Sequence, residues 1–274
     1  DLSDVAVRSR LLGAGFTAVS GGLDFDWVDG FTSRTLSAAL FDKPVSITIG
    51  PGETGRENGD LVDARFMADI KGIELQSWLQ TNGLLFDHVA LDQLFVGETA
   101  VTVDLIVGAS ADVYIETDLA DLAIHLPEPI GKRADEATVL ELQLNLSEHG
   151  NWQVFWKDRL QALVIREGGD FTGAVVDITP RDTPDFGVYD EEPRRTSGVL
   201  IAGARQELVL DPWINFYTAL KGESTKVRSV SWPAIDELAV EKVAFRDASA
   251  GPLLISASRA DAWYEVMFSL PNIN

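Results

Sequence analysis

The alternation of apolar and polar residues over 140–146 constrains the fold of this chain more than any other feature of its sequence. Leucines at every second position are separated by polar residues: Leu140, Leu142, Leu144 and Leu146 alternate with Glu141, Gln143 and Asn145. A period of two places the leucines on one face of a β-strand and the polar residues on the other. The same alternation recurs over 45–49 and 62–70. These segments predict an antiparallel sheet with one dry face and one wet face.

Further strands and a few helices are predicted from residue type and spacing. The other strand segments are Thr99–Val107, Ala111–Thr117, Trp152–Trp156, Ala162–Arg166, Ala174–Ile178, Gly198–Ala202, Leu238–Phe245, Leu253–Ser258 and Trp263–Leu270. Short helices are predicted at Ile73–Gln80, at Asp211–Phe216, where a capping aspartate precedes proline, and at Leu91–Phe95. The predicted fold class is therefore mainly β with a few short helices, in a curved antiparallel sheet that forms a groove or a half-open layer.

The chain is predicted to be a single elongated β-rich segment over 1–274. Ile73–Leu79 resembles Leu208–Ile214, and each places a tryptophan three residues after a leucine. This echo suggests two repeated units of about 1–135 and 136–274, with chance similarity in an apolar-rich chain as the alternative. The stretch 180–193 contains three prolines and five acidic residues and is predicted to be a mobile, exposed loop.

Charge and cysteine content exclude several classes of function. The 22 basic and 43 acidic residues give a net charge of −21, which disfavours binding to nucleic acid or to an anionic membrane surface. Without cysteine, the chain has no disulfide and no thiolate chemistry, and this composition suits both cytoplasm and periplasm. No apolar run reaches the roughly 20 residues that span a bilayer. The start at Asp1-Leu2-Ser3-Asp4 lacks both a methionine and a signal peptide, so we expect a fragment or a processed product.

No motif in the sequence predicts catalysis, a metal site or a cofactor. Gly131-Lys132 lacks the first glycine of a phosphate loop, and Gly13-Ala14-Gly15 lacks the third glycine of a dinucleotide fingerprint. No Gly-x-Ser-x-Gly elbow occurs, and the acids of 182–192 do not match an EF-hand. The histidines have no spacing typical of metal ligands: His88, His125 and His149. We therefore predict that the chain is not an enzyme, although a hydrolase that uses dispersed carboxylates is an alternative.

Trp152 and Trp156 form an aromatic stripe on the predicted strand. With Val154 between them, both indoles lie on one face of the strand. Core packing is the default explanation, and an exposed stripe would instead bind sugars or acyl chains. One alternative function is thus a β-sandwich interaction module or carbohydrate-binding module with these tryptophans on its outer face.

Three segments together resemble the YhdP family, a branch of the AsmA-like proteins. Asp121–Lys132 resembles a family signature in which a strand of the type "dL.gl.l" runs into "LP.PLgK". Gly198–Gly203 followed by Leu208–Trp213 resembles a second landmark, a strand leading to "ldlD.W", and Trp263–Phe268 resembles a third. The landmarks occur in the family's order and span a little over the C-terminal half of the chain.

This resemblance implies an envelope protein of Gram-negative bacteria that is associated with phospholipid movement toward the outer membrane. Such proteins have an inner-membrane anchor and a long periplasmic body, a curved β-groove with an apolar interior and no catalytic residues. The implied location is the periplasm, and the implied partners are phospholipid acyl chains and other envelope proteins. This chain lacks the anchor and most of the body, so it would correspond to a piece of the groove or to a cap.

The dry face of the predicted sheet must be covered by something, and the predicted helices are too few to cover it. A second sheet could close a sandwich, or the apolar face could curl around acyl chains, each buried methylene contributing about 0.8 kcal/mol. The residues predicted to line the lipid site are Val45, Ile47, Ile49, Ala64, Phe66, Ile70, Leu142 and Leu144. Aspartate in place of Phe66 or Leu144 is expected to abolish lipid binding.

Overall fold

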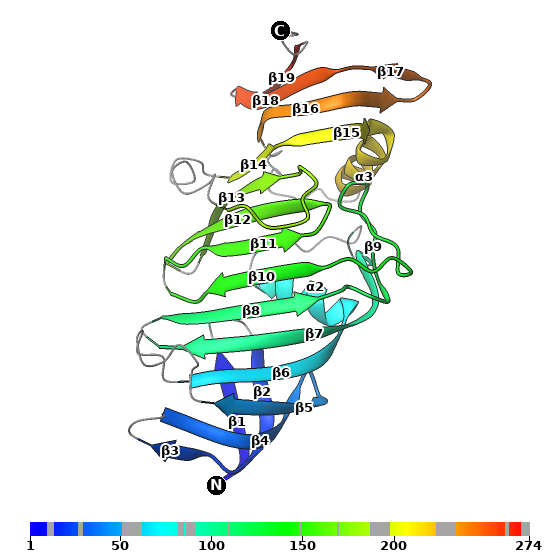
Figure 1. Ribbon diagram of the computed structural model, residues 1–274. Coiled ribbons are helices and arrows are strands. Elements are labelled where there is room, and N and C mark those ends of the chain that lie inside the picture. Colours follow the sequence, from blue (N-terminus) through cyan, green and yellow to red (C-terminus); the bar gives the residue numbers. More distant parts are fainter. Residues whose placement is uncertain are drawn as a thin grey trace.

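The described part of the chain folds into one large, open, curved sheet (Figure 1). The computed structural model describes residues 1–9, 14–26, 30–50, 62–81, 85, 91, 93–108, 110–147, 149–168, 170–186, 198–222, 234–260 and 263–269. Within these residues the chain forms 19 strands and two helices, α2 and α3. The mainly β fold class is therefore confirmed.

Most neighbouring strands are antiparallel and follow the order of the chain. The paired series runs through β1 (Leu2–Ser9), β2 (Ala14–Gly21), β4 (Gly30–Leu40), β5 (Lys43–Gly50), β6 (Val62–Lys71), β7 (Phe95–Val107) and β8 (Ala111–Thr117). It continues through β10 (Leu140–Asn145), β11 (Trp152–Trp156), β12 (Leu160–Glu167) and β13 (Asp170–Asp177). Two short strands flank this series: β3 (Asp24–Asp26) pairs with β4, and β9 (Leu122–Ile124) pairs with β7.

The C-terminal part of the sheet contains parallel pairs, which corrects the purely antiparallel expectation. Its strands are β14 (Gly198–Ala202), β15 (Ala204–Val209), β16 (Ala234–Phe245), β17 (Ala248–Ala250), β18 (Leu253–Ala260) and β19 (Trp263–Ser269). β14 runs parallel to β13, and β16 runs parallel to both β14 and β15. Parallel neighbouring strands require a crossover connection between them. The chain provides a long connection before β14 and a connection that contains a helix before β16.

A glycine separates β14 from β15. Gly203 has a φ of +117°, and a Cβ there would lie 2.2 Å from Oδ1 of Asp177. Only glycine adopts this conformation at so little cost and leaves room for the carboxylate. The break lets the chain pair first with the start of β16 and then with its middle.

Each helix begins directly after a strand. α2 (Gly72–Thr81) follows β6 and confirms the helix predicted at Ile73–Gln80, and α3 (Leu210–Gly222) follows β15. Asp211 does not cap α3, because the helix already begins at Leu210; its carboxylate instead accepts the backbone N–H of Arg246 at 2.6 Å. Of the helix predicted at Leu91–Phe95, Leu91 is in a 3-10 helix, and Phe95 instead starts β7 and pairs with Ile124 of β9.

The two suggested repeat units are parts of one continuous sheet. β8 and β10 pair residue for residue across the boundary near 135, from Leu140 opposite Thr117 to Asn145 opposite Asp112. The helical echo also occupies two different connections, because α2 joins antiparallel strands and α3 joins parallel ones. An internal repeat thus stays a prediction.

The start of the loop predicted at 180–193 is tied to the sheet. The Asp185 backbone N–H donates to Gln161 Oε1 at 2.9 Å, and Gln161 Nε2 donates to the Asp185 carbonyl at 2.9 Å. Residues 187–193 of that prediction lie outside the described residues.

Candidate functional site

One face of the sheet carries an unbroken row of apolar side chains. Because paired residues of neighbouring strands lie side by side on the same face, the strand register defines this row. Its members are Leu36, Ile47, Phe66, Val103, Ile115, Leu142, Val154, Ala162, Val176, Ile201, Ile235 and Ala257. With about 4.8 Å between strands, the row extends over on the order of 50 Å.

A second apolar row runs beside the first on the same face. It lies two residues away along each strand and consists of Ile49, Ala64, Leu105, Val113, Leu144, Trp152, Val164, Ala174 and Val199. Together these two rows make up the apolar face of the sheet. The face is thus continuous across strands that are far apart in sequence.

The opposite face of the same strands, termed the outer face, is mainly polar over β6–β10, whereas over β11–β13 it carries the buried apolar side chains of Phe155, Leu163 and Val175. Arg65 and Asp104, paired across β6 and β7, form a two-pronged ion pair at 2.5 and 2.8 Å. On the next strands, Gln143 Nε2 donates to the Tyr114 hydroxyl at 3.2 Å. Over β6–β10 the division into an apolar and a polar face is the one that the alternation predicted.

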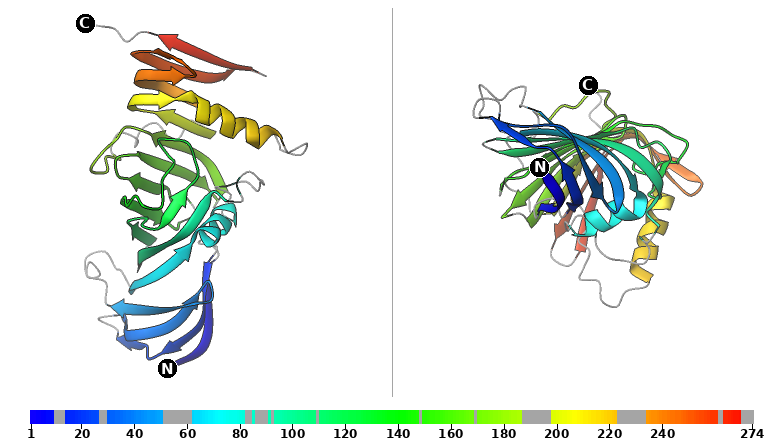
Figure 2. Two further views of the ribbon diagram at one scale, coloured as in Figure 1. Left: turned by 90° about the vertical axis from the view of Figure 1, so that its right-hand side faces the viewer. Right: turned by 90° about the horizontal axis from the view of Figure 1, so that it is seen from below.

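The apolar face lies on the concave side of the sheet. The β1–β2 pair and α2 both contact it, and both lie inside the curve of the sheet (Figure 2). Phe16 of β2 packs edge-on against Phe66 with ring centroids 5.1 Å apart. Trp78 of α2 stacks on Trp152 of β11 at 5.9 Å.

All eight residues predicted to line a lipid site lie on this concave side, but the structure divides them into two groups. Val45, Ile47, Ala64 and Leu144 are buried, and Leu144 is 0% exposed. The half-buried group consists of Ile49, Phe66, Ile70 and Leu142. The buried group is core that the chain's own residues cover, so only the half-buried group is placed to meet another molecule. Whether any of them binds lipid stays a prediction.

The apolar face is not sealed from end to end by the described residues. Beyond α2, the face continues through further half-buried side chains that were not among the predicted lining residues: Ile115, Val154, Val176, Val199, Ile201 and Ile235. The alternation within Ala111–Thr117 could have identified Ile115, and the position of Val154 between two tryptophans could have identified Val154. The others lie on strands with apolar residues on both faces, where alternation gives no direction.

Trp152 and Trp156 belong to the core. They therefore do not form the exposed aromatic stripe that a carbohydrate-binding module would need. Both indoles point to the concave side and are only 2% and 6% exposed. The Arg166 guanidinium lies over Trp152 at 4.3 Å and the Arg159 guanidinium over Trp156 at 5.2 Å. These cations cover the rings rather than leaving them open to a sugar.

The segment that carries the first family landmark folds back along one border of the apolar face. Ile124 of β9 pairs with Lys132, and Lys132 Nζ donates to the carbonyls of Leu122 and Arg133 at 2.8 and 2.9 Å. Burial lowers the pKa of Lys132. Arg159 holds the same segment through Glu128 and Glu136. These bonds give the two cations a structural role.

The remaining chemical candidates do not assemble into a metal centre in the described part of the chain. No group of three His, Asp or Glu side chains there could hold a metal ion. His125 and His149 are exposed and far apart in sequence, and His88 lies outside the described residues. Asp182, from the acidic stretch that does not match an EF-hand, lies 3.6 Å from Lys157. None of the described helices is long and apolar enough to cross a membrane.

Comparison with known proteins adds no assignment. No family model, curated protein or solved structure matches this chain. The resemblance to the YhdP family therefore depends on the three sequence landmarks alone.

Proposed function

We propose that this chain is a non-enzymatic segment of an AsmA-like, YhdP-like envelope protein that holds phospholipid acyl chains on the concave apolar face. In this proposal the segment lies in the periplasm, the parent protein is anchored in the inner membrane, and the lipid moves between inner and outer membrane. The observation that carries the proposal is the unbroken apolar row, most of whose members from β8 onward are half-buried.

The dimensions and energetics of the face suit hydrocarbon. A bilayer core is about 30 Å thick, so one acyl chain extends over roughly 15 Å. The row, on the order of 50 Å long, is several times that length. Each methylene moved from water onto the face contributes about 0.8 kcal/mol when fully buried, without any specific polar contact. Because one apolar strand resembles the next, a bound chain would meet similar surfaces as it slides along the row.

The proposal is tested by asking whether the purified chain carries lipid. The chain is produced without detergent, extracted with organic solvent, and the extract is analysed by mass spectrometry. The expected result is co-purified phospholipid, together with uptake of a fluorescent phospholipid from vesicles. An extract without phospholipid and no uptake from vesicles would contradict the proposal.

Two adjacent residues of β8 provide a matched pair of variants. Ile115 is half-buried on the apolar face, whereas Tyr114 is 40% exposed on the outer face. Ile115→Asp places a charge under the acyl chain and should reduce lipid binding at least about tenfold, because a carboxylate would lose water without gaining a partner. Tyr114→Asp should leave binding unchanged.

A second matched pair on β6 tests the region near the β1–β2 pair. Phe66 is half-buried against Phe16, and Met67 is 66% exposed on the outer face. Phe66→Asp should lose lipid and Met67→Asp should retain it, with circular dichroism showing that both variants keep their strands. Equal lipid content in the two folded variants would refute the assignment of Phe66.

A further inference from the structure

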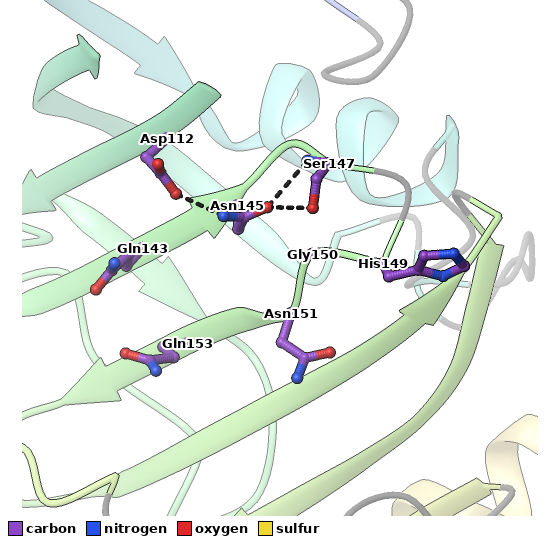
Figure 3. Close-up of a pocket in the computed structure, with 8 residues that line it drawn as sticks. All are labelled: Asp112, Gln143, Asn145, Ser147, His149, Gly150, Asn151 and Gln153. Atoms are coloured by element: carbon purple, nitrogen blue, oxygen red, sulfur yellow. Dashed lines mark hydrogen bonds between the residues drawn. The ribbon is translucent and has the colours of Figure 1, made fainter. Parts of the chain in front are cut away.

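The outer face carries a polar pocket over a deeply buried part of the sheet (Figure 3). Its volume is about 310 Å³, near the lower end of small-molecule sites at roughly 300–1,000 Å³. The pocket lies where β8, β10 and β11 meet, and its lining residues alternate along these strands with Val113, Leu144 and Trp152 of the apolar face. These three core residues are at most 2% exposed, so buried core lies directly beneath the pocket.

The lining is chemically distinctive because most of its side chains are neutral amides. Gln143, Asn151 and Gln153 carry amides that can donate and accept, and His149 adds an imidazole. Asn145 and Ser147 also line the pocket, but the Ser147 hydroxyl donates to Asn145 Oδ1 at 2.6 Å. Among the described residues, no lysine, arginine or apolar side chain lines the pocket. The lining therefore suits a neutral ligand with many hydroxyl groups.

The polar groups are held in place by bonds beneath them. The single carboxylate of the lining, Asp112, accepts Asn145 Nδ2 at 2.9 Å and the Ser110 hydroxyl at 2.7 Å. Asn145 Oδ1 accepts the backbone N–H of Ser147 at 3.0 Å. Gly150 closes the turn, since a Cβ there would lie 2.2 Å from Asn145 Oδ1. Asp112 is thus engaged within the protein, and the amides are presented by a fixed frame.

A cross-strand row extends this polar surface to an aromatic ring. Tyr114, Gln143 and Gln153 are paired across β8, β10 and β11, and Tyr114 is 40% exposed beside the pocket. An exposed ring next to bidentate amides provides an apolar plate for the C–H face of a sugar and hydrogen bonds for its hydroxyls. We infer that this pocket is a binding site for a neutral saccharide, on the face opposite the one proposed for lipid and independent of it.

The inference is tested by NMR titration of the full chain with neutral disaccharides. The probes are maltose, cellobiose and N,N′-diacetylchitobiose, with glucose 6-phosphate as the charged comparison, each up to about 50 mM to detect affinities in the millimolar range. The expected result is a shift of the Gln143, Asn151 and Gln153 side-chain amides with at least one neutral disaccharide. A shift at Trp152 or Ile115 instead would place the ligand on the apolar face and overturn the inference.

Variants on β10 and β11 separate the pocket from the surrounding surface. Gln143→Ala and Gln153→Ala should each weaken disaccharide binding about tenfold, because each removes an amide group of the pocket lining that would bond to the ligand. Glu141→Ala is the matched control, since Glu141 is exposed on the same face of β10 one pleat away, and it should bind normally. The absence of any shift, equal binding by the Gln143 and Glu141 variants, or stronger binding of glucose 6-phosphate would each overturn the inference.

Discussion

The two ends of the apolar face have the same sequence pattern but different surroundings. Over β4–β6 the β1–β2 pair covers the face, and Leu36, Val45 and Ile47 are buried. Over β10–β14 the second row is buried up to Ala174, whereas Leu142, Val154 and Val176 of the first row are half-buried. Alternation predicts which side of a strand is apolar, and the cover on that side decides whether the residue is core or accessible surface.

The same comparison separates stability from binding. Residues under the β1–β2 pair contribute burial energy to folding, because their contacts are made within the chain. Half-buried residues beyond α2 keep part of their hydrophobic free energy available to another molecule. Substitutions at covered and uncovered positions test this division, from the largest expected effect to the smallest.

The largest effect is expected from truncating the fully buried leucine of β10. Leu144→Ala should lower the free energy of unfolding by about 3–4 kcal/mol, because it removes buried methylenes and leaves a cavity. Leu142→Ala, two residues away on the same face but half-buried, should cost about 1–2 kcal/mol. Urea denaturation measures both values. Equal losses would show that the face is uniformly covered and would break the comparison.

This pair also shows which part of the candidate site could be predicted from sequence. The alternation over 140–146 assigned Leu142 and Leu144 to one face, and the register confirms it. It could not distinguish the two, because burial depends on Trp78 and Trp152, which arrive from other parts of the chain. Contacts of this kind are set by the tertiary fold and leave no local pattern.

The strands within the first forty residues were not predicted from the sequence. The pairing of β1, β2 and β4 contains irregularities between Leu2 and Val5 and between Thr17 and Ser20. Asp4 and Ala18 have positive φ values of 55° and 51°. Each bulge shifts the alternation by one residue and bends the strand, so the period of two disappears. The same bends allow β1 and β2 to fold over the apolar face.

The next largest effect is expected from removing the cover that α2 provides. Trp78→Ala should destabilise the protein by about 2–3 kcal/mol, since the half-buried indole stacks on Trp152. It should also raise lipid uptake, because the apolar face beneath α2 becomes accessible. Thermal unfolding and the vesicle uptake assay measure the two effects. Destabilisation with reduced uptake would show that Trp78 belongs to the binding surface rather than to its cover.

A smaller, pH-dependent effect is expected at the base of α2. Lys43 Nζ lies 2.6 Å from Glu98 and 3.2 Å from Glu74 of α2. The hydrogen bond from Lys43 lowers the pKa of Glu98 below its ordinary value of 4.5. Burial alone would lower the pKa of Lys43, but its bonds to Glu98 and Glu74 outweigh burial and raise the pKa above 10.5.

The sign of the pH dependence follows from these two shifts. Because the pKa of Glu98 is lower in the folded state, its contribution is present above pH 4.5 and is lost as the pH falls through the folded value. The raised pKa of Lys43 keeps its contribution until the pH rises above 10.5. Lys43→Met should therefore lower the melting temperature at neutral pH and have little effect well below pH 4.5. A difference that grows in acid would contradict this assignment.

The smallest effect is expected from substitutions on the outer face. In the lipid proposal this face does not bind lipid and provides no cover for the apolar face. The side chains of Arg65 and Asp104 are 67% and 25% exposed, and ion pairs in such surroundings typically contribute less than about 1 kcal/mol because water screens them. A double-mutant cycle with Arg65→Ala and Asp104→Ala should give a coupling energy below this value, and lipid uptake should not change. A large loss of uptake in these variants would mean that the two faces are coupled, since Arg65 adjoins Phe66 on the same strand. An unchanged uptake beside the loss expected for Phe66→Asp would instead confine lipid contact to the concave face.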